Sequence, residues 1–125
     1  MIIGTGVDIV GIDRIRRVTE RQKDRFIHRV FTPAEQSFCS RFRDPAPHFA
    51  ARFAAKEALF KALGTGWAKG VTWLDVEVQR QDRQAPVLVL RGEAEKQSIR
   101  LGANRVHLSL SHSDQWAVAM VILEN

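Results

Sequence analysis

The sequence predicts a single α+β domain, in which helices from the first half pack on a mostly antiparallel sheet. Apolar residues recur at helical spacing before residue 63, and they alternate with polar residues after residue 73. No linker, internal repeat or low-complexity segment divides the 125 residues. This length suits one domain of about 100–150 residues. We therefore expect one domain that spans residues 1–125.

The chain begins with a predicted strand and a basic helix. Residues 1–12 are rich in β-branched residues and glycine, which predicts a strand whose glycines mark tight bends or close backbone approach. Ile12, Ile15 and Val18 then recur at helical spacing with arginines between them, which indicates an amphipathic helix. A second short helical pattern follows and ends near Val30.

Two further helices are predicted before residue 64. The sequence Thr32-Pro33-Ala34-Glu35 supplies an N-cap, a proline at the first helical position and a capping-box glutamate. We expect this helix to run to about Arg43, because the proline-rich sequence of residues 44–47 breaks it. Residues 48–63 contain neither proline nor glycine, are rich in alanine and end at Gly64, which predicts a long helix.

The second half of the chain is dominated by predicted hairpins. Residues 73–79 alternate strictly, which predicts a strand with one solvent-exposed face, and residues 86–90 pair with it across a polar turn. The remaining predicted elements are a helix over 93–101, capped by Gly102, and a final hairpin of strands over 106–111 and 116–123.

The positive charge of the chain is confined to one segment. Lys and Arg outnumber Asp and Glu by 19 to 14, and residues 14–29 hold seven basic and two acidic residues, which accounts for the whole net charge of +5. One cationic segment indicates one anionic partner, which charge alone leaves open between nucleic acid, a membrane and an acidic protein.

Composition points to a cytoplasmic protein. No apolar run approaches the roughly 18 residues of a membrane span, and the N-terminus lacks the basic region of a signal peptide. The single cysteine, Cys39, allows no internal disulfide, which fits a reducing compartment. We expect Cys39 to pack in the core.

Two carboxylates stand in apolar surroundings and are the candidates for chemistry. Glu57 interrupts the apolar side of the long helix, and Asp8 lies in an otherwise apolar strand. The ordinary alternatives are an i,i+4 ion pair of Glu57 with Lys61, and an Asp8 that faces solvent or binds a nearby backbone amide. Two carboxylates without a thiol or clustered histidines suit a hard cation such as Mg²⁺.

A lysine and a glycine-bearing segment follow Glu57 directly. Lys61 and residues 64–70 are candidates for holding phosphate groups, although a glycine C-cap with a lysine in the last helical turn is also common in structural helices. The segment is not a Walker A loop, and Gly4-Thr5-Gly6 lacks the third glycine of a dinucleotide-binding fingerprint.

Taken in order, the motifs resemble a known family. They are Gly6-Val7-Asp8-Ile9-Val10, Phe31-Thr32-Pro33-Ala34-Glu35, Arg52-Phe53-Ala54-Ala55-Lys56-Glu57-Ala58, Lys61-Ala62-Leu63-Gly64-Thr65-Gly66 and His107-Leu108-Ser109-Leu110-Ser111-His112. This combination, which covers essentially the whole chain, resembles the bacterial holo-acyl-carrier-protein synthases, the small group of 4′-phosphopantetheinyl transferases.

The resemblance implies an activity in fatty acid biosynthesis. Phosphopantetheine passes from coenzyme A to a serine of apo-acyl carrier protein, and adenosine 3′,5′-bisphosphate is released. The residues matching Asp8 and Glu57 hold Mg²⁺, Lys61 adds a charge at the pyrophosphate, and the proton acceptor stays open between Asp8, Glu57 and a metal-bound water. Further coenzyme A contacts match Arg52, Gly64, Pro86, His107 and Ser111. The family is typically a homotrimer with active sites between subunits.

The basic helix is then the predicted docking surface for the acidic carrier protein. Its expected contacts are Arg14, Arg17, Arg21 and Arg25, with Phe26 as an apolar contact. Many relatives carry a glutamate where this chain has Gly11, which bears on carrier docking and not on the metal pair. A nucleic-acid-binding module and a metal-dependent phosphohydrolase are the alternatives. The transferase interpretation expects neither nucleic acid nor membrane as a partner.

Overall fold

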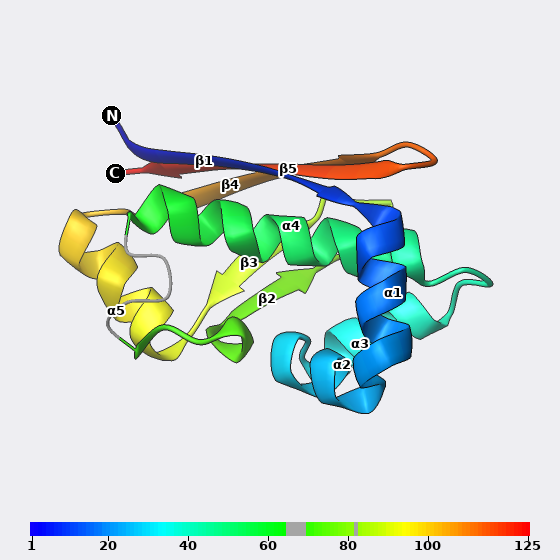
Figure 1. Cartoon of the computed structure of the whole chain (residues 1–125). Helices are drawn as coiled ribbons and strands as arrows, with labels where there is room; N and C mark the ends of the chain where they lie inside the picture. Colours follow the sequence, from blue (N-terminus) through cyan, green and yellow to red (C-terminus); the bar gives the residue numbers. More distant parts are fainter. Residues whose placement is uncertain (65–69, 82) are drawn as a thin grey trace.

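One long helix runs through the centre of the molecule and carries the sheet. The computed structural model describes residues 1–64, 70–81 and 83–125. Helix α4 (Ala46–Leu63) lies beneath an antiparallel sheet of β1 (Ile2–Gly11), β5 (Trp116–Glu124) and β4 (Arg105–His112), in the order β1-β5-β4 (Figure 1). The other elements are α1 (Ile12–Gln22), α2 (Asp24–Val30), α3 (Pro33–Ser40), η2 (Trp73–Asp75), β2 (Val76–Gln79), β3 (Val87–Leu90) and α5 (Gly92–Leu101). The α+β prediction is confirmed.

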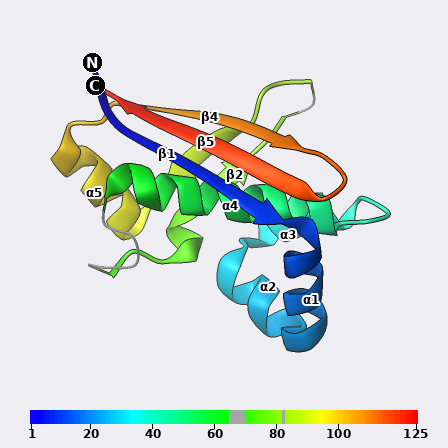
Figure 2. The same ribbon diagram turned by 45° about the horizontal axis from the view of Figure 1, so that its top comes forward.

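The helices gather at the two ends of α4. Helices α1, α2 and α3 lie together around its N-terminal half, and α5 lies at its opposite end (Figure 2). The hairpin of β2 and β3 is antiparallel, as expected, and forms a separate two-stranded sheet. The final hairpin of β4 and β5 is confirmed as well.

Glycines on β1 bring its backbone against α4. Gly4 and Gly6 point to the helix, and a Cβ added at either would collide with a backbone carbonyl oxygen, that of Ala62 or Ala58 respectively. The predicted close backbone approach is therefore confirmed. Because alternate strand residues share a face, Asp8 also points toward α4.

The core surrounds α4 on nearly all sides. Phe31 packs on Phe49 with ring centres 4.8 Å apart, and Phe53 stacks on Trp73 at 5.0 Å. Cys39 is fully buried beside them, which confirms its expected packing role, and this burial raises the pKa of its thiol to about 12. A helix that is apolar around most of its circumference is a buried core helix.

The prediction of a strand over residues 73–79 is wrong at its start. Residues Trp73–Asp75 form a 3₁₀ turn, because the Thr72 backbone N–H donates to the Asp75 carboxylate at 3.2 Å and fixes a tight cap. The predicted solvent-exposed face is only partly present, since Val76, Glu77 and Val78 are buried and Gln79, at the end of the strand, is exposed. The alternating pattern predicted that Glu77 faces solvent, whereas its carboxylate is buried and accepts hydrogen bonds from Thr32 and Gln79.

Two helix boundaries also differ from the prediction. The helix that begins at the Thr32 capping box, which is confirmed, ends at Ser40 and not near Arg43. The long helix begins at Ala46, two residues earlier than expected. Pro47 lies in its first turn, where the missing N–H of proline costs no hydrogen bond, so the proline-rich sequence starts a helix.

Candidate active site

Three of the predicted site residues converge between β1 and α4. The Lys61 ammonium donates to Asp8 Oδ1 and to the Val7 carbonyl oxygen, each at 3.0 Å. Glu57 lies one helical turn before Lys61 and close enough to Asp8 for the two charges to interact. Lys61 therefore bonds across to the strand, and the alternative in which it serves as an ordinary i,i+4 partner of Glu57 does not describe this site.

The electrostatics of the pair favour a bound cation. Partial burial raises the pKa of Glu57, the negative charge of Asp8 raises it further, and the charges of Lys61 and Arg14 act in the opposite direction. Two repelling carboxylates are stabilised by a cation between them. Their oxygen donors suit Mg²⁺, which commonly binds through one or two carboxylates together with water and phosphate oxygens.

Asp8 and Glu57 are the carboxylates that the described residues bring to this site. Within residues 1–64, 70–81 and 83–125, no group of three or more His, Cys, Asp or Glu side chains is placed to hold a metal. A cation held by Asp8 and Glu57 alone would have coordination positions open to water and to substrate oxygens. An open site of this kind suits a metal that also contacts a phosphate group.

Gly64 ends the helix that carries Glu57 and Lys61. Its φ of 76° is left-handed, a conformation that favours glycine, and its N–H donates to the Phe60 carbonyl at 3.1 Å. Gly64 therefore has the ordinary C-cap role. Residues 65–69 of the predicted phosphate-binding segment, and Asp82 of the predicted turn, lie outside the described residues.

Arg52 belongs to a second group of residues, on the other side of α4. Its guanidinium lies over the Phe38 ring, 4.1 Å from the ring centre, and Nη1 donates to the His48 carbonyl at 3.3 Å. Arg52 is 4% exposed, and its Nε has no hydrogen-bond partner in the part of the chain that the structure describes. It lines a hollow of about 550 Å³ together with Arg41 and Arg80. A buried, unpartnered guanidinium N–H beside two more arginines suits an anionic ligand.

Within a single chain, the other predicted coenzyme A contacts lie apart from the carboxylate pair and from the group around Arg52. His107 and Ser111 are exposed on the outer face of β4, and the His107 ring lies 3.0 Å from the Glu124 carboxylate. Pro86 is half-buried and immediately precedes β3. No single chain brings these residues to Asp8 and Glu57.

The sequence did not predict that two histidines near Arg52, His48 and His112, lie next to each other. The His48 ring stacks on Phe42 with centres 3.5 Å apart and meets the His112 ring edge-on at 5.7 Å. Burial and the charges of His112, Arg52 and Arg80 lower the pKa of His48. The two histidines come from the start of α4 and the end of β4, so no sequence spacing signals their proximity.

The basic face on α1 and α2 is largely unneutralised. Its four predicted docking residues are exposed: Arg14, Arg17, Arg21 and Arg25. The ion pairs among the described residues leave these four out, whereas Arg16 bonds to Asp13 at 2.5 Å and to Asp44 at 2.7 Å. The positive charge of Arg14 is the last of the causes that act on the pKa of Glu57, and it lowers that pKa.

Phe26, the predicted apolar contact of this face, is mostly buried. It is 5% exposed and packs edge-on against Phe31, so most of its ring belongs to the core. Its accessible edge lines a hollow of about 250 Å³, which is also lined by Arg14, Arg17 and Arg21. An apolar contact of Phe26 with a partner would therefore be made inside this recess.

The outer face of the sheet carries exposed apolar side chains. Val7 and Ile9 of β1 are about 60% exposed, and Trp116 and Met120 of β5 are about 50% exposed. Their register places Val7 opposite Met120, so these side chains form a continuous surface.

In the described residues, no helix is long and apolar enough to cross a membrane.

Comparisons with known proteins agree with this arrangement. Residues 4–121 match the 4′-phosphopantetheinyl transferase superfamily. The holo-[acyl-carrier-protein] synthase of Koribacter versatilis is 50% identical over 125 residues, which covers 100% of both chains. The crystal structure of the same enzyme from Neisseria meningitidis matches with a TM-score of 0.91, at 33% identity and 100% coverage of both chains. That from Helicobacter pylori, in complex with coenzyme A, matches with a TM-score of 0.84 at 32% identity, covering 96% of this chain and 99% of the other.

Proposed function

Because the chain belongs to the 4′-phosphopantetheinyl transferase superfamily, we propose that Asp8 and Glu57 hold a Mg²⁺ ion at its reaction centre. Its activity is that of the holo-[acyl-carrier-protein] synthases, the transfer of 4′-phosphopantetheine from coenzyme A to apo-acyl carrier protein. The observation that carries the proposal is the convergence of Asp8, Glu57 and Lys61 between β1 and α4.

Each of the three residues has a distinct role in this proposal. Asp8 and Glu57 provide the carboxylate oxygens, and a bound Mg²⁺ would stabilise the negative charge on the pyrophosphate during transfer. Lys61 is 54% exposed at its side chain, so its ammonium is accessible to a phosphate oxygen while it stays near Asp8. The two carboxylates are also the groups available to accept the proton of the attacking serine hydroxyl.

The nucleotide end of coenzyme A is proposed to bind at Arg52. The unpartnered Nε and the neighbouring arginines suit a phosphate, and Phe38 and the half-buried Pro86 offer apolar surface. Arg52 and Glu57 lie on opposite sides of α4, because five residues along a helix turn by about 140° from each other. This separation favours a site completed by a second subunit.

A homotrimer with active sites between its subunits would bring the carboxylate pair of one subunit to the Arg52 group of another. The exposed apolar surface of Val7, Ile9, Met120 and Trp116 is suited to burial against a neighbouring copy. His107 and Ser111 share the outer face of the sheet, so burying it would bring them to the subunit boundary, near a neighbour's ligand. Gly64 and Pro86 are proposed to complete the coenzyme A contacts.

The basic face is proposed to dock the acidic carrier protein. Arg14, Arg17, Arg21 and Arg25 attract a negative partner, and the recess beside Phe26 can receive an apolar side chain. The similarity to holo-[acyl-carrier-protein] synthases favours a carrier protein over a nucleic acid as the partner of this face. A cytoplasmic location fits the unpaired, buried Cys39.

One incubation tests the transferase and its alternatives. The protein is mixed with apo-acyl carrier protein, coenzyme A and Mg²⁺, and the mass of the carrier protein is measured by mass spectrometry. We expect a gain of one phosphopantetheine group, lost with Glu57→Gln at unchanged circular dichroism. No gain with a competent carrier would contradict the transferase, and coenzyme A cleavage without carrier would indicate a phosphohydrolase. Retained transfer by Glu57→Gln would contradict the metal role.

The docking proposal has its own measurement. Arg14→Ala and Arg21→Ala should raise the KM for carrier protein at low salt, and the difference from wild type should shrink as salt screens the charges. Arg100→Ala is the matched control, because it removes the same charge from α5, at the far end of α4 (Figure 1). Equal effects of all three substitutions, or none, would contradict a docking face on α1.

A further inference from the structure

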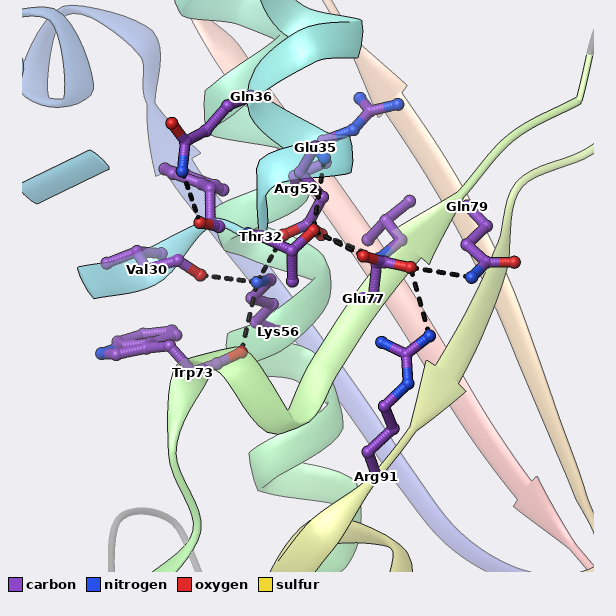
Figure 3. A network of polar contacts seen from close by, with 12 residues as sticks. Val30, Thr32, Glu35, Gln36, Arg52, Lys56, Trp73, Glu77, Gln79 and Arg91 are labelled. Carbon is purple, nitrogen blue, oxygen red and sulfur yellow. Dashed lines mark hydrogen bonds and ion pairs between the residues drawn. The ribbon is translucent and has the colours of Figure 1, made fainter. Parts of the chain in front are cut away.

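A buried lysine lies next to Glu57 in the sequence, and the proposed chemistry does not use it. Lys56 is 0% exposed. Its ammonium donates to Glu35 Oε1 at 2.7 Å, to the Val30 carbonyl at 2.5 Å and to the Trp73 carbonyl at 3.2 Å, which uses all three of its N–H donors (Figure 3). These acceptors come from three separate elements, α3, α2 and η2.

Glu35 is the matching half of this buried pair. It is 1% exposed, accepts from the Thr32 backbone N–H at 2.9 Å, and accepts at its second oxygen from the Val78 N–H at 2.8 Å. The Thr32 hydroxyl continues the network to Glu77 at 2.6 Å. The pair thus joins α4 to α3 and β2 through hydrogen bonds of fixed direction (Figure 3).

The opposite side of α4 is held by β1. The glycine backbones of Gly4 and Gly6 touch the helix backbone there, and Lys61 bonds to Asp8. Glu57 is carried by the same helix, between these two sets of contacts. Turning α4 about its axis moves Glu57 relative to Asp8, and it also pulls Lys56 from acceptors that have no freedom to follow.

From this geometry we infer that Lys56 is a positioning residue, whose buried ion pair with Glu35 sets the rotation of α4 and so the placement of Glu57 beside Asp8. The inference rests on the proposed metal role of Asp8 and Glu57. Breaking one half of a buried ion pair is strongly destabilising, whereas replacing both halves is often tolerated. A role in stability and a role in positioning are separable for that reason.

Two variants remove the ion pair. Glu35→Gln retains a capping-box residue, but its amide N–H₂ replaces one of two oxygens that both accept hydrogen bonds and leaves the Lys56 charge unpaired, so circular dichroism and Tm first establish that it is folded. The double substitution Glu35→Gln with Lys56→Met removes both charges at similar volume. Leu59→Ala is the matched control: it is fully buried in α4, destabilises by lost packing and touches none of these polar contacts.

The readout is Mg²⁺ affinity, measured by titration calorimetry on folded protein, with kcat and the carrier KM alongside. We expect each variant to weaken Mg²⁺ binding about tenfold, which is the lower end of the effect of outer residues that orient metal ligands. Carrier KM should stay unchanged, and Leu59→Ala should lower Tm without changing Mg²⁺ affinity.

Each outcome decides between the two claims. Wild-type Mg²⁺ affinity in the folded variants would overturn the role of Lys56, and so would an equal loss in Leu59→Ala. If one of the two variants does not fold, the other decides. If wild type itself binds no Mg²⁺, or Glu57→Gln binds it equally well, the proposed metal site fails instead.

Discussion

Replacing Gly6 by alanine tests whether the backbone contact between β1 and α4 is essential. The added Cβ would meet the Ala58 carbonyl oxygen, and would lie 2.8 Å from the Ala58 carbonyl carbon and 2.9 Å from the Ala62 nitrogen. These partners are backbone atoms inside a helix, so they cannot rotate away. The strand must then shift as a unit, and Asp8 shifts with it.

The cost follows from the rigidity of the partners. Overpacking a core by one methyl group costs about 1–3 kcal/mol, and we expect the upper end because helix backbone obstructs the new atom. A loss of about 3 kcal/mol, with a urea m-value of about 2 kcal/mol/M, lowers the unfolding midpoint by about 1.5 M. It is a large share of the roughly 5–15 kcal/mol that stabilises most domains.

Gly11→Ala on the same strand is the matched control. Its Cβ would lie 3.7 Å from Trp116 and 4.0 Å from Arg14, which are ordinary contacts, and its φ of −72° suits any residue. Removing that glycine should change stability by less than about 1 kcal/mol. Urea unfolding followed by circular dichroism measures both variants. Equal midpoints for Gly6→Ala and wild type, or equal losses in both variants, would refute the reasoning.

Three further outcomes are expected. The folded state raises the pKa of Glu57 above 4.5, so the stability that the Glu57 carboxyl contributes is full below that pH and is lost as pH rises through the raised value. Glu57→Gln should therefore have a higher Tm than wild type at pH 7 without metal. Added Mg²⁺ should raise the Tm of wild type and leave that of Glu57→Gln unchanged. A lower Tm for Glu57→Gln under metal-free conditions would contradict the repulsion from Asp8. Lys61→Met should change stability by less than about 1 kcal/mol, because the Lys61 side chain is 54% exposed, and it should lower kcat/KM for coenzyme A about 100-fold in the transfer assay. A drop in Tm that accounts for the loss of activity would argue against a phosphate contact. The Cys39 thiol, buried and with a pKa of about 12, should resist iodoacetamide at mildly alkaline pH and react fully in urea, as mass spectrometry would report; rapid labelling of native protein would contradict its burial.

Features with a local cause could be predicted from the sequence. The capping box at Thr32 depends on residues three apart, and the glycines of β1 signalled a close approach although not its partner. Asp8 and Glu57 were singled out because a carboxylate in an apolar element needs a reason. Their proximity, however, depends on how β1 lies on α4, which no spacing encodes.

Features with a long-range cause escaped prediction. Lys56 resembles a surface lysine in the sequence, and its burial depends on carbonyls supplied by Val30 and Trp73. The alternation over residues 73–79 suggested an exposed face for the same reason, since Glu77 is buried by partners elsewhere in the chain. Buried polar residues follow the polar pattern of a surface, so periodicity alone assigns them to solvent.

The order of the sheet, β1-β5-β4, has a consequence for how the protein is made. Strand β1 pairs only with β5 among the described strands, so Asp8 finds its register opposite Ala119 after nearly the entire chain has left the ribosome. Pairings so distant in sequence close slowly, because the loop entropy is lost before the contacts form. Strand β1, which precedes the other described strands in the chain, is thus expected to be among the last to be fixed, and the Asp8 carboxylate is expected to reach its final position beside Glu57 only after β5 has paired.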